Sequence, residues 1–281
     1  LDAFTEERFI TTSATAPVDD KGYFIGDKAD VRKYGQPALA SVDEVEYTDV
    51  APNQIVSVST SLIPFLEHDD AARALMGSNM QRQAVPLIRP QAPVVGTGVE
   101  QRAAYDSGRM LISKTDGTVV GVEADQISIQ TESGDVVEYS LEKFLRSNAS
   151  TCLNQKPGVA KGDTVRSGDM LADGPAIQHG ELALGQNVLV AFMSWELGNY
   201  EDAILIYERL VHDDRFTSTH IENYSISVRD TKLGPEVVTR DIPNVSEEKL
   251  KDLDEDGIVR IGAEVSSGDI LVGKITPKGE T

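Results

Sequence analysis

The chain has 281 residues, of which 40% are hydrophobic and 26% charged, and this composition indicates folded domains rather than a disordered polymer. Its formal net charge of -20 disfavours nonspecific binding to nucleic acid, because such binding depends on neutralising phosphates. A single cysteine excludes an internal disulfide and favours a reducing compartment, and no run reaches the roughly 18 apolar residues of a membrane-spanning helix.

Length and turn content indicate how the chain is organised. The length allows two or three domains, and 23 glycines with 12 prolines predict many turns and therefore β-rich modules. The chain starts Leu-Asp-Ala without a methionine and stops at "PKGET", so we expect an internal part of a longer chain.

The N-terminal part is expected to be β-rich. Residues 1–60 alternate short apolar runs with turns. Within and after them, "KGYFIGDK" at 21–28 and the β-branched "QIVSVSTSLIPF" at 54–65 are typical of strands.

A helix, a break and a second helical turn are expected at 69–86. Asp69 or Asp70 can cap the first helix, and Gly77 suits its C-terminal end. Ser78 then begins a capping-box pattern, which predicts the second turn.

Residues 71–99 contain three arginines and no acidic residue, which is unusual in so acidic a chain. In the second turn Asn79, Arg82 and Gln83 share one face. Such a face suits phosphate and sugar oxygens, because a guanidinium forks onto oxyanions while amides both donate and accept. The alternative is an ordinary amphipathic surface helix. Its inward-facing apolar stripe would consist of Met76, Met80 and Ala84.

A β-meander is expected at 109–140, with hairpin turns at Asp116-Gly117 and at 133–135. Residues 141–160 look irregular, and 161–175 are strands separated by Gly-Asp turns.

An internal repeat links "GDTVRSGDMLADG" at 162–174 with "GAEVSSGDILVGK" at 262–274. The residues that recur 100 positions later are Gly162, Val165, Ser167, Gly168, Asp169 and Leu171. Gly-Asp allows a tight turn, so two similar β modules are predicted. The pattern resembles the hammerhead of biotinyl and lipoyl carrier domains, but the Met-Lys-Met tip common in those domains does not occur. A hammerhead-type carrier or interaction module without catalysis is therefore an alternative function.

Two apolar strands, "NVLVAFM" and "AILIYERLV", are expected within 184–211, around a polar turn that carries Glu201 and Asp202. Adjacent acids at a turn are either solvated or support a divalent cation. The neighbouring Trp195 and Tyr200 predict a packed, rigid turn.

The C-terminal part is again expected to be mostly β. Strands continue through 217–243 and return in the last twenty residues. Between them, residues 246–256 predict a short helix, with Ser246 as its N-cap and Gly257 just past its end.

No self-contained catalytic constellation is visible. His68-Asp69-Asp70 is similar to the motif of HD-type metal hydrolases, but the remaining histidines show no ligand spacing. Neither a Ser-His-Asp order nor a phosphate loop occurs.

Five long stretches together resemble the family of bacterial DNA-dependent RNA polymerase β subunits. They are "SLIPFLEHDDAARALMGSNMQRQAVPLIRP", "GVAKGDTVRSGDMLADGP", "GELALGQNVLVAFMSWELGNYEDAIL", "RDTKLGPEVVTRDIPNV" and "IGAEVSSGDILVGKITPKGET". The resemblance runs from about residue 50 to the end and is weak over 1–49.

The resemblance implies roles for individual residues. Arg73 of "RALMG" would lie near the incoming nucleoside triphosphate. Asn79, Arg82 and Gln83 of "NMQRQ" would lie along the nascent RNA of the RNA–DNA hybrid, on a wall that borders the rifamycin pocket. Glu201 and Asp202 would approach a second Mg²⁺ carried by the nucleotide, whereas the main magnesium-binding aspartates belong to the β′ subunit.

The resemblance also implies an architecture and partners. The fold is expected to be mainly β with short helices (α+β), in several lobes, with part of a double-psi β-barrel and a barrel- or sandwich-like flap module. The expected lobes are 1–60 with 101–145 (peripheral, external), 61–100 with 146–215 (hybrid-binding core and part of the barrel) and 216–281 (start of the flap). Implied partners are the β′, α and sigma subunits, template DNA, nascent RNA and NTPs, in a cytoplasmic nucleotidyltransferase of which this chain alone would be inactive.

Three short stretches depart from the family pattern. Ala72 stands where the family usually has asparagine, which puts one nucleotide-sugar contact in doubt. Ser194 stands in "FMSW" where the family has "FMPW", and "LGNYED" replaces "GYNFED", so the turn chemistry around Glu201 can differ.

Overall fold

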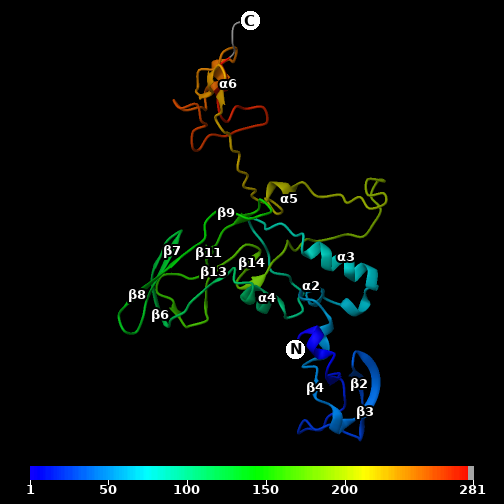
Figure 1. The fold of residues 1–281 in the computed structure, drawn as a ribbon. Helices are drawn as coiled ribbons and strands as arrows, with labels where there is room; N and C mark the ends of the chain where they lie inside the picture. The colour runs from blue at the N-terminus through cyan, green and yellow to red at the C-terminus, as the bar shows by residue number, and fades with distance from the viewer. Residues whose placement is uncertain (278–281) are drawn as a thin grey trace. The chain divides into compact units, whose positions relative to one another are not determined.

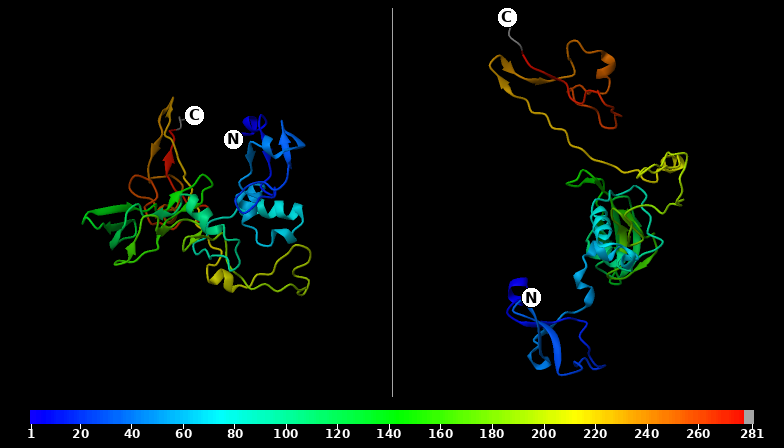
Figure 2. Two further views of the ribbon diagram at one scale, coloured as in Figure 1. Left: turned by 90° about the horizontal axis from the view of Figure 1, so that it is seen from below. Right: turned by 90° about the vertical axis from the view of Figure 1, so that its right-hand side faces the viewer.

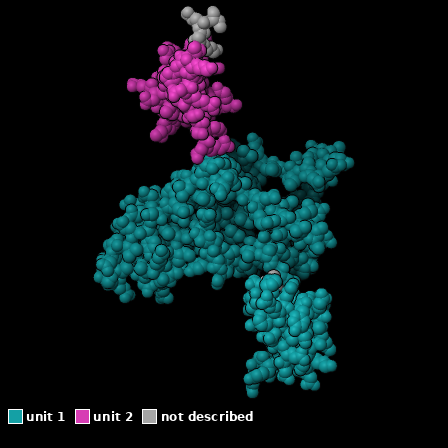
Figure 3. Space-filling view, viewed as in Figure 1, with its two compact units in different colours: residues 1–221 teal, residues 222–281 magenta. Residues whose placement is uncertain are grey.

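A computed structural model describes residues 1–277, and it consists of short strands in several small sheets with a few short helices (Figure 1). The predicted class, mainly β with short helices, is confirmed. The chain divides into two compact units, residues 1–221 and residues 222–281 (Figure 3).

The N-terminal residues form a small sheet of order β3-β2-β1-β4. Its elements are α1 (Ala3–Glu6), β1 (Ile10–Thr12), β2 (Lys28–Lys33), β3 (Gln36–Ser41), η1 (Val42–Glu44) and β4 (Tyr47–Thr48). Tyr34 and Gly35 join β2 to β3 with φ of 54° and 73°, as a two-residue hairpin turn requires. The strand predicted at 21–28 is wrong, because the carboxylate of Asp19 accepts from the amides of Lys21 and Tyr23 and holds a turn there.

A helical segment follows instead of the strand predicted at 54–65. It contains η2 (Pro52–Ile55), α2 (Val58–Ser61), η3 (Leu66–His68) and α3 (Ala71–Gln81). Ser57 is the N-cap of α2, and its hydroxyl accepts from the amide of Thr60 at 3.1 Å. This local hydrogen bond outweighs the β preference of the Val, Ser and Thr side chains.

The predicted break at Gly77 and Ser78 is also wrong, because α3 runs through both residues without interruption. These small residues face α2: Ser78 is 9% exposed, and a Cβ on Gly77 would lie 3.9 Å from Cδ1 of Ile63. The predicted inward stripe is wrong too, since Met76 and Met80 are exposed. The small side chains form the packed face, and the long ones point outward.

The main core lies where the meander packs on strands from 156–173. The elements are α4 (Glu100–Asp106), β5 (Leu111–Ile112), β6 (Gly117–Val122), β7 (Gln126–Gln130), β8 (Val136–Ser140), β11 (Lys156–Pro157), β12 (Thr164–Val165) and β13 (Met170–Asp173). They form sheets of order β12-β6-β7-β8 and β11-β13-β5. Val119, Ile127, Ile129 and Leu171 are at most 1% exposed in this core.

The two predicted meander turns have different outcomes. The turn at 133–135 is confirmed, with Gly134 at a φ of 92° between β7 and β8. The hairpin at Asp116-Gly117 is wrong, because β5 pairs with β13 rather than with β6. The chain therefore passes from one sheet to the other at this point.

The strands predicted within 184–211 are wrong. After β9 (Leu145–Arg146), β10 (Cys152–Leu153), β14 (Ile177–Gln178) and β15 (Glu181–Leu182), the next element is α5 (Arg209–His212). Residues 188–208, which we call the excursion, form a long loop without helix or strand (Figures 1 and 2). Its apolar side chains are exposed, including Leu189 and Phe192 at 103% and 98%. A strand needs a partner, and none of residues 1–277 pairs with this segment.

The second unit holds short paired strands and one helical turn. Its elements are β16 (Asp230–Thr231), β17 (Gly234–Pro235), β18 (Val237–Val238), α6 (Glu247–Leu250) and β19 (Lys274–Ile275). Ser246 is the N-cap of α6 as predicted, but the helix ends at Leu250 rather than near residue 256. The amide of Asp254 instead donates to the carbonyl of Ile258 and forms a turn closed by Gly257 at a φ of 80°.

The internal repeat is a repeated turn geometry. Asp169 accepts from the amide of Arg166 at 2.8 Å, and Asp269 accepts from the amide of Ser266 at 2.7 Å. The glycines before them, Gly168 and Gly268, have φ of 96° and 95°. Each unit thus contains the same Gly-Asp turn, which confirms that this part of the repeat is structural.

Candidate functional site

Helix α3 and the two residues that follow it carry most of the predicted site residues. It begins at Asp70, whose carboxylate accepts from the amide of Ala72 at 3.1 Å, and it packs on α2 through Ser78. Arg73 and Arg82 are exposed, and neither forms an ion pair with a carboxylate of residues 1–277. The helix therefore presents two guanidinium groups that are free to bind anions.

The two arginines lie on opposite flanks of α3. At about 100° and 1.5 Å per residue, nine residues separate Arg73 from Arg82 by about half a turn around the axis and about 13 Å along it. The packed face, with Gly77 and Ser78, lies between them. One helix can thus offer a guanidinium to each of two neighbouring ligands.

The predicted group of Asn79, Arg82 and Gln83 lies at the C-terminal end of α3, and two of its side chains are in contact. The guanidinium of Arg82 donates to Oδ1 of Asn79, which orients both side chains, and Gln83 is exposed just beyond the helix. Arg73 is not part of this group. Its Nη1 instead lies 3.9 Å from the sulfur of Met76. The site is therefore an Asn79–Arg82 pair on one flank and a single arginine on the other.

The carboxylate turn lies in the excursion. Asn199 shapes it, because its Oδ1 accepts from the amide of Trp195 at 2.9 Å and its Nδ2 donates to the carbonyl of Met193 at 2.6 Å. Glu201 follows with a φ of 58° and is exposed, as is Asp202. The prediction of a packed turn is wrong, since Trp195 is 56% exposed.

These carboxylates do not complete a metal centre by themselves. Within residues 1–277, no group of three or more His, Cys, Asp or Glu side chains could hold a metal ion. Mg²⁺ requires six oxygen ligands in octahedral geometry, and two neighbouring carboxylates leave most of them to other molecules. His68, from the hydrolase alternative, instead lies beside the ring of Phe65, with centroids 6.4 Å apart.

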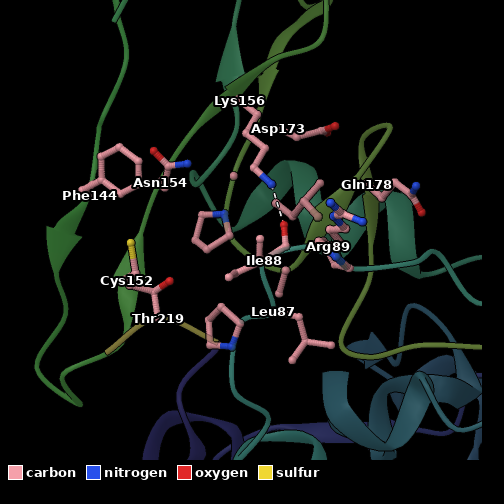
Figure 4. A pocket seen from close by; sticks show the side chains of 16 residues that line it. Leu87, Ile88, Arg89, Phe144, Cys152, Asn154, Lys156, Asp173, Gln178 and Thr219 are labelled. Atoms are coloured by element: carbon pink, nitrogen blue, oxygen red, sulfur yellow. Dashed lines mark hydrogen bonds between the residues drawn. The ribbon is translucent and has the colours of Figure 1, made fainter. Parts of the chain in front are cut away.

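Sequence reasoning missed a cleft of about 420 Å³ beside the segment that follows α3 (Figure 4). Its lining comes from four separate stretches, 86–90, 144–156, 173–178 and Thr219, so no local pattern could reveal it. In the cleft, Nζ of Lys156 donates to the carbonyl of Ile88 at 2.6 Å (Figure 4). The lysine thereby fixes the backbone of the segment that leads away from α3.

Glu100 anchors the loop that precedes α4. Its carboxylate accepts from the amides of Thr97 and Gly98 at 2.7 and 2.8 Å, and the residue is 5% exposed. Burial alone raises the pKa of this carboxyl, but the hydrogen bonds from Thr97 and Gly98 outweigh burial and hold its pKa below the ordinary value. A Cβ on Gly96 would lie 2.8 Å from Oε1 of Glu100, so glycine lets the loop close over the carboxylate.

No helix within residues 1–277 combines the length and apolar character that crossing a membrane requires.

Comparison with known proteins identifies the family. Residues 112–281 match the family model described as RNA polymerase Rpb2, domain 6, and residues 1–51 match the RNA polymerase beta subunit external 1 domain. The DNA-directed RNA polymerase subunits beta of Chloroflexus aggregans and of Clostridium botulinum strain Hall are each 58% identical over 282 residues. The alignments cover 100% of this chain but 23% of each relative, so the chain spans about a quarter of their length. The chain belongs to the family of RNA polymerase β subunits, in the part that comprises the external 1 domain and Rpb2 domain 6.

Proposed function

We propose that the chain helps to form the active cleft of a DNA-dependent RNA polymerase, where it positions the incoming NTP and the RNA–DNA hybrid. The observation that carries the proposal is the pair of exposed guanidinium groups on opposite flanks of α3, in an otherwise acidic chain. Similarity to named β subunits over the whole chain supports it.

Arg73 is proposed to bind the triphosphate of the incoming nucleotide. Its guanidinium is exposed and has no carboxylate partner among residues 1–277, so nothing in this part of the chain competes with a phosphate. A positive group placed beside the triphosphate stabilises the charge that develops during phosphoryl transfer. Ala72 beside it supplies no polar side chain, so the nucleotide sugar needs a contact from elsewhere.

Asn79, Arg82 and Gln83 are proposed to contact the nascent RNA of the hybrid. The bond from Arg82 to Asn79 leaves further guanidinium donors for a phosphate, and the amides can donate to or accept from ribose hydroxyls. Because this pair lies across the helix from Arg73, α3 would stand between nucleotide and RNA, with one flank facing each.

Glu201 and Asp202 are proposed to approach the Mg²⁺ that the nucleotide carries. That ion would neutralise phosphate charge when bound, and most of its ligands would come from the nucleotide and the β′ subunit. The contribution of this chain is to hold two carboxylates at one exposed turn, which Asn199 shapes.

The proposed setting is a multisubunit enzyme. The partners would be the β′, α and sigma subunits, with template DNA, in the bacterial cytoplasm. The exposed apolar side chains of the excursion agree with burial in such an assembly, as part of a double-psi β-barrel completed by other residues. The division of the chain into lobes stays a prediction, and the isolated chain is expected to be inactive in nucleotide addition.

The experiment is single-nucleotide addition by polymerase reconstituted with Arg73→Ala in the full-length subunit. Loss of a charge-assisted contact of about 1.5–3 kcal/mol predicts a fall in kcat/KM of about ten- to a hundredfold. The matched control is Arg102→Ala, an exposed arginine that pairs with Asp106, and it should change kcat/KM little. An unchanged rate for Arg73→Ala in an assembled enzyme would refute the proposed nucleotide contact.

A further inference from the structure

We propose that Asn187 is a positioning residue: its side-chain amide attaches residues 185–187, which we call the root of the excursion, to residues 88–94. Nucleotide addition depends on that attachment. We call residues 88–94 the base segment. The inference rests on the proposed function for the role of the carboxylate turn in the excursion, but the attachment itself rests on geometry alone.

The base segment and the chain before the excursion lie side by side as a short antiparallel bridge. The amide of Gln91 donates to the carbonyl of Gly185 at 2.9 Å. Two residues further, the amide of Asn187 donates to Oε1 of Gln91 at 3.0 Å. Gln91 therefore binds this strand-like root with both its backbone and its side chain.

Asn187 adds two bonds that extend the attachment along the base segment. Its Nδ2 donates to the carbonyl of Ala92 at 2.8 Å, and its Oδ1 accepts from the amide of Val94 at 3.3 Å. A primary amide carries a donor and an acceptor on separate atoms of one short side chain, so it can bond two backbone groups at once. Aspartate at this position would keep the acceptor but place a carboxylate against a carbonyl.

The chain after the excursion returns to the same base segment. The amide of Ile88 donates to the carbonyl of Thr217 at 2.9 Å. Nη1 of Arg215 donates to Oε1 of Gln186 at 3.4 Å, which joins the outgoing and returning chains directly. The excursion is thus a closed loop whose two ends are attached to neighbouring positions of one segment.

The base segment is itself fixed to the folded core. Lys156 of β11 holds the carbonyl of Ile88 (Figure 4), and Oε1 of Gln178 in β14 accepts from the amide of Ala92 at 2.7 Å. The excursion has no comparable support. Within residues 1–277, every hydrogen bond of residues 188–208 ends on a residue between 188 and 212.

In this arrangement the position of the carboxylate turn depends on the hydrogen bonds at the root. Helix α3 ends at Gln81, and the chain continues from it into the base segment. The base segment therefore connects directly to the arginines of α3 and also supports the excursion. Removing the amide of Asn187 deletes two of the bonds that set the direction in which the excursion leaves. The turn with Glu201 would then sample more positions relative to α3.

The test uses polymerase reconstituted with the full-length subunit carrying Asn187→Ala or Asn187→Asp. The matched control is Asn148→Ala, an exposed asparagine whose side chain forms no hydrogen bond within residues 1–277. Two measurements are made on each enzyme: amide hydrogen exchange over 88–94 and 188–208, and kcat with KM for single-nucleotide addition.

For Asn187→Ala we expect faster exchange at Val94 and through the excursion, and a kcat lower by about tenfold with KM for the nucleotide nearly unchanged. Loss of assembled enzyme would also lower the apparent kcat at unchanged KM, so kcat is calculated per active site of assembled enzyme, and a merely structural role would then leave it at the wild-type value. Asn187→Asp should keep most protection at Val94, because Oδ1 remains, and should show an intermediate kcat. Asn148→Ala should match the wild type in both measurements.

Either of two results would overturn the inference: exchange unchanged in Asn187→Ala, or faster exchange with a wild-type kcat. Glu201→Gln in the same assay separates this inference from the proposed function. If Glu201→Gln has wild-type kcat while Asn187→Ala still loosens the excursion and lowers kcat, the proposed role of that carboxylate fails and the attachment stands.

Discussion

Substitution of Glu100 by glutamine should destabilise residues 1–221 through loss of charge rather than loss of volume. The carboxylate accepts from two backbone amides and from the hydroxyl of Thr97, at 2.7, 2.8 and 3.3 Å. Glutamine keeps one oxygen but turns an NH₂ group toward the amide of Gly98 or of Thr97, where two donors then face each other. Losing one charge-assisted bond and weakening the others costs about 2–3 kcal/mol.

The size of the effect can be measured by urea unfolding followed by circular dichroism. In thermal unfolding the same cost corresponds to a fall in Tm of about 4–12 °C for a unit of this size, at about 2–4 °C per kcal/mol. Glu132→Gln is the matched control, because Glu132 is exposed in the turn between β7 and β8 and its carboxylate forms no hydrogen bond within residues 1–277. Its stability should stay within about 0.5 kcal/mol of the wild type.

The pH dependence tests the electrostatic reasoning. Because the folded pKa of Glu100 lies below its ordinary value, its stabilisation is fully present above an unfolded pKa of about 4.3 and is lost as pH falls through the lower folded value. The difference between wild type and Glu100→Gln should therefore be large at about pH 7.5 and smaller at about pH 3. An equal difference at both pH values would show that packing, not charge, stabilises the loop, and no difference at neutral pH would refute the argument altogether.

Two further predictions concern side-chain contacts, one in each unit. Leu171→Ala, at a fully buried position of the main core, should cost about 2–5 kcal/mol in urea unfolding, whereas Leu189→Ala in the exposed excursion should cost less than about 0.5 kcal/mol. In the second unit, Lys274→Met removes the 2.8 Å ion pair to Glu236, and this ion pair holds the pKa of the Glu236 carboxyl below its ordinary value. The Tm of the second unit should therefore fall at neutral pH, and the fall should be smaller in high salt because salt screens the ion pair in the wild type. A loss of equal size at all salt concentrations would contradict the ionic explanation.

The features that the sequence predicted correctly are those set by a few adjacent residues. The turn at 133–135 needs one glycine in the left-handed region, and the cap at Asp70 needs one carboxylate beside free amides. The Gly-Asp turns of the repeat belong to the same class, because the aspartate bonds an amide three residues earlier. Such signals act within four residues and depend little on the rest of the fold.

The failures arise where two local signals compete or where the partner is distant. Residues 54–65 combine β-branched side chains with a capping serine, and the cap at Ser57 prevails. The glycine at position 77 predicts a helix end, yet it serves close packing against Ile63. Residue type alone does not distinguish a glycine that ends a helix from one that admits a neighbour.

The excursion shows a different limit. Its apolar runs correctly predict side chains suited to burial, but periodicity does not say which segment will cover them. Within residues 1–277 no strand pairs with it, and Phe192 is left 98% exposed. The predicted strands thus failed for lack of a partner in the described chain, not for lack of strand-forming residues.

The candidate site combines both kinds of signal. Charged residues such as Arg73 and Glu201 stand out in the sequence because their chemistry is specific. The amides that hold their supports do not, since the partners of Asn187 lie 93 to 96 positions away along the chain. A loop without packing of its own takes its position from such bonds at its root. Substitutions at these inconspicuous amides should therefore alter the geometry of the site as strongly as substitutions of the charged groups alter its chemistry.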